Sequence, residues 1–265
     1  MTTIMYSTKN QTLLRDIHSD VHLDKTVSDK KDSFFSQVSF NSKNIVRIIL
    51  LLISTLLIIE LALLYLKYYL NFNAPLFRII EGFFDFDKEA NFPTLLSSVL
   101  LLFASLTLLF LYKTAPTKKY YWLLLSSLFL FLCFDEATQI HEKFDKIKSR
   151  LEPLNDSILV HVWVLPYLLL ILLLIFFLKS FIFNLPAKTR NLFILSGIIF
   201  VGGAVGLEII EGQLKVLNQG EDNLTLDVLY CIEEVCEMIG VTIFIYALLD
   251  YIAPKRSSIF IMTRI

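Results

Sequence analysis

Six long apolar segments dominate the pattern of hydrophobic and polar positions along the chain. They cover residues 46–69, 94–112, 120–142, 158–182, 191–215 and 226–252. An α-helix rises about 1.5 Å per residue, so about 20 apolar residues cross the hydrocarbon core of a bilayer, which is roughly 30 Å thick. The pattern therefore predicts an all-α, polytopic membrane protein in which residues 45–253 form a six-helix transmembrane bundle.

Three polar or shorter stretches complete the predicted organisation. Residues 1–44 are rich in Ser, Thr, Asp and Lys and predict a disordered cytoplasmic tail, and residues 254–265 predict a second, short cytoplasmic tail. Residues 75–84 place apolar side chains at helical spacing. This spacing predicts a helix that lies along the membrane interface between the first two spans.

The composition agrees with a membrane protein and indicates which kind of partner to expect. Of the 265 residues, 55% are hydrophobic and 18% are charged, and the mean hydropathy is +0.64. A net charge of -1 gives no indication of nucleic-acid binding, so the lipid bilayer is the predicted partner. Cys133, Cys231 and Cys236 all fall in apolar segments, which is typical of small buried side chains rather than of a disulfide or a metal clip.

Lys and Arg residues predict the orientation of the spans. If the N-terminus is cytoplasmic, two thirds of the 24 Lys and Arg residues fall on the cytoplasmic side. The loop between the third and fourth spans carries four basic residues and argues the other way. The sequence predicts a protein of a bacterial cytoplasmic membrane with both termini in the cytoplasm.

Acidic residues gather on the side of the membrane opposite to most of the basic ones. Most of the 25 Asp and Glu residues lie in outer loops or at the outer ends of spans, and the inner loops 113–119 and 183–190 contain none. Asp and Glu contribute little to topology, so this asymmetry needs another cause. Ionisable groups inside a bilayer are costly, and they indicate a functional site by default.

The third span carries ionisable residues before its predicted outer end. No Gly or Pro occurs between residues 120 and 151, which predicts one continuous helix. On a regular helix Asp135 and Glu142 share a face, while Glu136 and His141 fall outside it in opposite directions. We expect Asp135 and Glu142 to face the site, with His141 as a further candidate.

The fifth span carries a polar stripe at a similar depth. Glu208, Glu211 and Lys215 share one face of a regular helix. Gly202 and Gly206 lie on another face, where small residues let a second helix approach closely.

The sixth span carries a second stripe. Asp227, Tyr230, Glu234 and Glu237 are spaced three or four residues apart, and Glu233 lies beside this stripe. We therefore expect Glu234 and Glu237 to matter more than Glu233.

Two further ionisable residues lie in the first and fourth spans. His161 comes one turn before Pro166, which cannot donate a backbone hydrogen bond and therefore predicts a kink next to the imidazole. The acidic groups at similar depth make His161 a candidate ligand or proton carrier. Glu60 is either a further contributor to the site or the partner of Lys67, which lies seven residues later on the same face.

A divalent metal is the cofactor that these residues predict. Carboxylates close together cannot all stay ionised unless a cation or protons neutralise them. Carboxylates with one or two His residues suit Zn, Fe, Mn, Mg or Ca. The expected metal ligands are Asp135, Glu142, His161, Glu208, Glu211, Glu234 and Glu237. The expected catalytic residues are Glu234 and His141, which would move a proton while the metal polarises a substrate oxygen or activates water.

The leading functional hypothesis is a metal-dependent membrane enzyme that acts on a lipid or lipid-linked substrate from the extracytoplasmic leaflet. One alternative is a proton- or cation-coupled transporter that uses the same carboxylates. However, the inner halves of the spans carry almost no ionisable residues, so no path across the membrane is visible. A second alternative is a structural or assembly subunit of a membrane complex. In a simpler interpretation, the acids only solvate helix ends and pair with neighbouring Lys and Arg residues.

Overall fold

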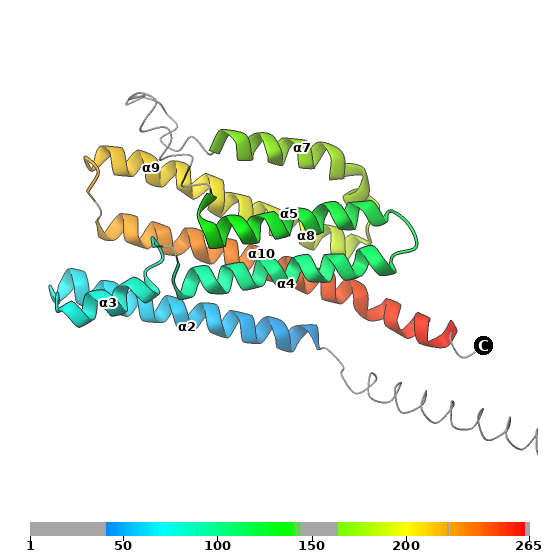
Figure 1. Ribbon diagram of the computed structural model, residues 1–265, viewed down its shortest axis with the longest axis horizontal. Helices are drawn as coiled ribbons and strands as arrows, with labels where there is room; N and C mark the ends of the chain where they lie inside the picture. Colours follow the sequence, from blue (N-terminus) through cyan, green and yellow to red (C-terminus); the bar gives the residue numbers. More distant parts are fainter. Residues whose placement is uncertain (1–40, 89, 141–142, 144–163, 222, 263–265) are drawn as a thin grey trace, which may run out of the picture. The chain divides into compact units, whose positions relative to one another are not determined.

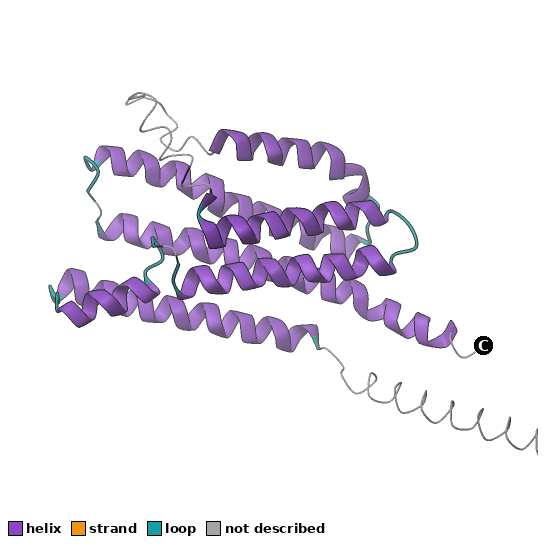
Figure 2. Cartoon of the chain, viewed as in Figure 1, coloured by secondary structure: helices purple, strands orange, loops and turns teal. Residues whose placement is uncertain are grey.

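The computed structural model describes residues 41–88, 90–140, 143, 164–221 and 223–262. All regular elements of these residues are helical, and no strand occurs among them (Figure 2). In chain order (Figure 1), the helices are α2 (Ser42–Tyr69), α3 (Pro75–Phe84), α4 (Phe92–Thr114), α5 (Lys119–Thr138), α7 (Val164–Phe183), α8 (Ala187–Val201), the π-helix η1 (Gly202–Leu207), α9 (Glu208–Leu217) and α10 (Leu224–Met262).

Six helical segments of the described chain are long and apolar enough to cross a membrane. They are α2, α4, α5, α7, the continuous run Ala187–Leu217 formed by α8, η1 and α9, and the part Leu224–Ala253 of α10. These segments coincide with the six predicted spans, so the predicted all-α membrane bundle is confirmed. The predicted helix at residues 75–84 is also present as α3, which buries Phe77 and exposes Leu76 and Ile79.

The third span differs from the prediction. The continuous helix expected as far as residue 151 is wrong, because α5 ends at Thr138 and Gln139 adopts a left-handed backbone conformation with φ of 57°. The Gln139 amide donates to the carbonyl of Asp135, which closes the helix with a left-handed C-terminal cap. This break comes before Glu142, which was expected to share a face with Asp135 and which lies outside the described residues.

The long helix α10 packs against most of the other helices. Its most extensive partner is α8, and it also contacts α4 and α2 (Figure 1). Met238, Ile245 and Leu248 of α10 are fully buried between these neighbours. The pair α4 and α5 is joined by two reciprocal hydrogen bonds, in which the hydroxyls of Ser105 and Ser126 each donate to the other residue's carbonyl, at 2.8 and 2.9 Å. The helix α10 is therefore the central element of the bundle, and it carries several of the acidic residues described below.

Close approach of α10 to the α8–η1 segment depends on two glycines. A Cβ atom on Gly240 would lie 2.9 Å from the backbone nitrogen of Phe200, and one on Gly203 would lie 3.0 Å from the carbonyl oxygen of Glu233. Gly202 and Gly206 were expected to let a second helix approach closely. That expectation is wrong for the described residues, because a Cβ on either glycine would meet none of their atoms within 4 Å.

An ion-pair network joins the ends of α2, α3 and α10. The Lys67 ammonium lies 3.1 Å from Glu81 and 3.0 Å from Asp227, and the Tyr68 hydroxyl also donates to Asp227. Lys67 is thus the partner of these two acids, and no ion pair between it and Glu60 occurs within the described residues. Glu60 is only 2% exposed and lies within electrostatic range of this network.

The loop between α3 and α4 is fixed by its own polar groups. The Asn91 side chain caps α4 by accepting from the Thr94 amide, and it donates to the carbonyls of Asp85 and Lys88. Lys88 pairs with Asp85 at 2.5 Å. Although partial burial lowers the pKa of the Lys88 ammonium, the hydrogen bond and charge of Asp85 raise it above its ordinary value overall. Phe86 and Asp87 of this loop line the cavity described next.

Candidate metal centre

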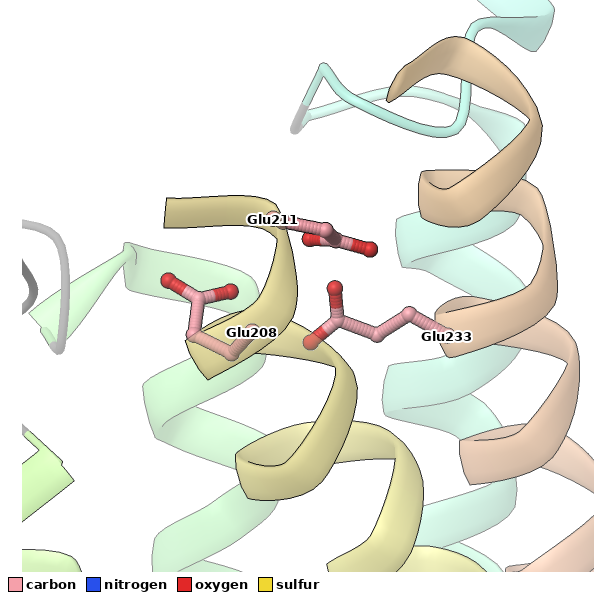
Figure 3. A group of neighbouring side chains, drawn as sticks. All are labelled: Glu208, Glu211 and Glu233. Carbon is pink, nitrogen blue, oxygen red and sulfur yellow. The ribbon is translucent and has the colours of Figure 1, made fainter. Parts of the chain in front are cut away.

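Three carboxylates from two helices meet beside the close contact of η1 with α10. Glu208 and Glu211 come from α9 and Glu233 comes from α10, and each offers an oxygen within 4.8 Å of the others (Figure 3). Glu211 and Glu233 extend toward one another between the two helices (Figure 3). Both are buried, and Glu208 is partly buried. Among the described residues this is the only group of three or more His, Cys, Asp and Glu side chains close enough to share one ion.

The π-helix η1 explains how Glu208 reaches this position. Glu208 follows Gly203, which packs directly on α10, by five residues. On an α-helix five residues correspond to a rotation of about 500°, so Glu208 would point about 140° away from that contact. A π-helix has more residues per turn than an α-helix, so η1 changes the direction of Glu208 relative to Gly203. A short π-helix of this kind is frequent at functional sites.

Electrostatic repulsion within the trio requires a neutralising partner. Two unit charges 4.8 Å apart repel by roughly 3 kcal/mol at an effective dielectric constant of about 20. Carboxylates this close together are not all ionised unless protons or a cation neutralise them. The trio is therefore suited to hold either protons or a cation.

The trio lines one end of a cavity of about 700 Å³. Asp135, Glu136, Glu234, Glu237 and Lys215 line the same end. Away from these groups the wall becomes apolar and includes Leu125, Phe129, Ile171, Phe193 and Phe244. The cavity is thus amphiphilic, and its volume is within the range of about 300–1,000 Å³ that is usual for ligand sites.

On the other side of the cavity, α5 and α7 are joined by a hydrogen bond. The hydroxyl of Tyr167 on α7 donates to Asp135 on α5 at 2.7 Å, and Asp135 is only 5% exposed. Phe131 of α5 also contacts the Tyr167 ring. This pair fixes the α5 wall of the acidic end of the cavity.

Substituting Tyr167 tests the importance of this bond. We expect Tyr167→Phe to destabilise the protein by about 1–3 kcal/mol, because the buried Asp135 carboxylate loses a donor. Thermal unfolding in mild detergent measures this effect. The matched control is Tyr65→Phe, since the Tyr65 side chain is exposed and stacks on Tyr69. Equal unfolding temperatures for the two variants would contradict a stabilising role for the bond.

The structure brings together all five of the predicted ligands that it describes. Asp135, Glu208, Glu211, Glu234 and Glu237 all line the one cavity. The remaining predicted residues, His141, Glu142 and His161, lie outside the described residues.

Glu233, expected to lie beside the acidic stripe of α10, also lines the cavity and belongs to the trio. On α10 the residues that line the cavity are Tyr230, Glu233, Glu234, Glu237, Val241 and Phe244, whereas Asp227 faces Lys67 and Tyr68. The cavity-facing stripe is therefore rotated away from Asp227, and it includes Glu233 as well as Glu234. The sequence could have indicated that Glu233 faces the cavity together with Glu237, because the two residues are one helical turn apart.

These observations define a class: a polytopic helical membrane protein with a carboxylate cluster at one end of an amphiphilic cavity. The chain belongs to the family described as Domain of unknown function (DUF8692), whose model matches residues 49–252. The match therefore covers the bundle from within α2 to within α10, including all the cavity-lining acids. No curated protein and no solved structure shows a significant match to the chain.

Proposed function

We propose that this protein is a divalent-cation-dependent membrane enzyme that acts on a lipid or lipid-linked substrate. The observation that carries the proposal is the convergence of Glu208, Glu211 and Glu233 at the acidic end of the cavity. Two oxygens bound to one Ca²⁺ ion at 2.3–2.6 Å are at most about 5 Å apart, so the spacing of the trio is compatible with a shared cation. An all-carboxylate set favours the hard ions Mg²⁺, Mn²⁺ and Ca²⁺.

The neighbouring carboxylates suit proton transfer. A bound cation would polarise a substrate oxygen or activate water. Glu234 and Glu237 line the same cavity next to the trio, so either can accept the proton that such a step releases. Lys215 lines the cavity as well and offsets part of the negative charge.

The apolar part of the cavity favours an enzyme over a transporter. Cation or proton transport needs ionisable or polar groups along the whole path. The described wall beyond the carboxylates is built from residues such as Leu125, Phe193 and Phe244, and Ser196 is its polar exception. A wall of this kind instead suits a substrate with a polar head and a hydrocarbon part.

Metal content and lipid turnover together test the proposal. Protein purified in mild detergent and dialysed against Mn²⁺ is expected to retain one or two equivalents by elemental analysis. A double variant, Glu208→Gln with Glu211→Gln, should retain almost none, because it loses two of the three charged ligands. The control is Glu221→Gln, since Glu221 is exposed in the loop before α10 and does not line the cavity.

Turnover is measured by mass spectrometry of membrane lipids incubated with the protein. We expect one lipid species to be consumed when Mn²⁺ is present and to be left intact when EDTA is added. Wild-type levels of Mn²⁺ in the double variant would contradict the cation site. Lipids that stay unchanged with every divalent cation would contradict the enzymatic function.

A further inference from the structure

The helix α7 is loosely attached to the rest of the bundle. Few residues of α7 are buried, and its backbone approaches α8 at only a few positions and α5 hardly at all. Its contacts with α5 are made at the two ends. Near the acidic end, Tyr167 bonds to Asp135; at the other end, Phe181 stacks on Tyr121 and packs edge-on against Trp122.

Between these two contacts, the cavity reaches the seam of α5 and α7. Leu128 and Phe129 of α5 line it from one side, and Ile171 and Leu174 of α7 line it from the other. Both helices are long and apolar enough to cross a membrane, so hydrocarbon surrounds this seam in a bilayer. An opening at this seam would connect the cavity to lipid rather than to water.

The length of the cavity matches one lipid chain. On α10 its lining runs from Tyr230 to Phe244, and the part from Glu233 of the trio to Phe244 spans 11 residues, or about 16 Å along the helix. This is about half of the roughly 30 Å hydrocarbon core and therefore the depth of one leaflet.

We propose that the apolar part of the cavity binds one hydrocarbon chain of a membrane lipid, which enters sideways between α5 and α7. The headgroup of this lipid then lies against the carboxylate trio. This inference deepens the proposed function and rests on it for the identity of the bound lipid as substrate. It assigns the substrate class: a lipid from the leaflet nearest the trio, with at least one slender chain that can lie along α10.

A glycine on α8 offers a direct way to fill the chain site. Gly197 lines the cavity, and a Cβ placed on it meets no described atom within 4 Å. Gly197 precedes Glu208 by 11 residues, so it lines the cavity well away from the trio. Gly202 is equally open but does not line the cavity, which makes it the matched control.

Photo-crosslinking in proteoliposomes tests the chain site. The probe is a palmitoyl phosphatidylethanolamine with a diazirine near the end of its chain. We expect crosslinks to Leu125, Phe193 and Phe244, which are at most 6% exposed and therefore out of reach of lipids outside the bundle. In Gly197→Trp these crosslinks should fall at least tenfold, while Gly202→Trp should keep them.

Mn²⁺ binding, measured on the same samples, separates folding from the effect on lipid. Crosslinks that persist in Gly197→Trp, or wild-type crosslinks confined to lipid-facing residues such as Leu172 and Phe176, would overturn the proposal. Crosslinks confined to lipid-facing residues in the wild type would overturn the proposal without the need for any variant. If the wild type shows the internal crosslinks but binds no Mn²⁺, the chain site stands and the proposed cation-dependent function fails.

Discussion

Replacing Glu233 by glutamine is expected to weaken Mn²⁺ binding by about 100-fold, which corresponds to about 2.7 kcal/mol. Glu233 is the only member of the trio supplied by α10, and it lies between that helix and Glu211 (Figure 3). An amide of the same shape keeps an oxygen but removes the charge that a buried cation requires. Isothermal titration with Mn²⁺ in detergent measures the change.

Two matched variants control this prediction. Glu234→Gln changes the next residue, which lines the cavity but is not part of the trio, and we expect a smaller loss of affinity. Glu221→Gln changes an exposed carboxylate and should leave the affinity unchanged. A larger loss in Glu234→Gln than in Glu233→Gln would show that the cation is held along the stripe predicted from the sequence rather than by the trio.

Replacing Gly240 by alanine is expected to destabilise the bundle by about 1–3 kcal/mol and to weaken Mn²⁺ binding as well. The added Cβ would lie 2.9 Å from the backbone of Phe200, and neither backbone can yield without moving its helix. Separating α8 from α10 also moves Glu208 and Glu211 away from Glu233. Thermal unfolding and Mn²⁺ titration measure the two effects.

The control for this substitution is Gly202→Ala. Gly202 belongs to the same continuous span, yet an added Cβ meets open space there. We expect unchanged or slightly higher stability, because alanine favours a helix over glycine. If both variants unfold at the wild-type temperature, the contact of α8 with α10 is not as close as the structure describes.

The six spans could be predicted from the sequence because the bilayer sets their length and composition. The break after α5 could not be predicted in this way. Left-handed caps usually carry Gly or Asn, and here the position is occupied by Gln139, a residue without that signal. The C-terminal end of α5 therefore could not be recognised from the sequence, because no Gly or Pro marks it.

The candidate site could be predicted in outline but not in its contacts. The depth of Glu208, Glu211, Glu234 and Glu237 follows from counting residues along each span. Their faces depend on helix phase, which the π-helix η1 changes just before Glu208. A regular helical wheel also could not show that Gly203, rather than Gly202 or Gly206, lies against α10.

The position of a bound cation is the most direct test of the central claim, and anomalous diffraction from crystals grown with Mn²⁺ measures it. The account predicts one main peak between α9 and α10, roughly 2.0–2.6 Å from a carboxylate oxygen of each of Glu208, Glu211 and Glu233. A second, weaker peak toward Glu237 would agree with two equivalents of metal. A main peak away from these three residues, or no peak at saturating Mn²⁺, would contradict the account.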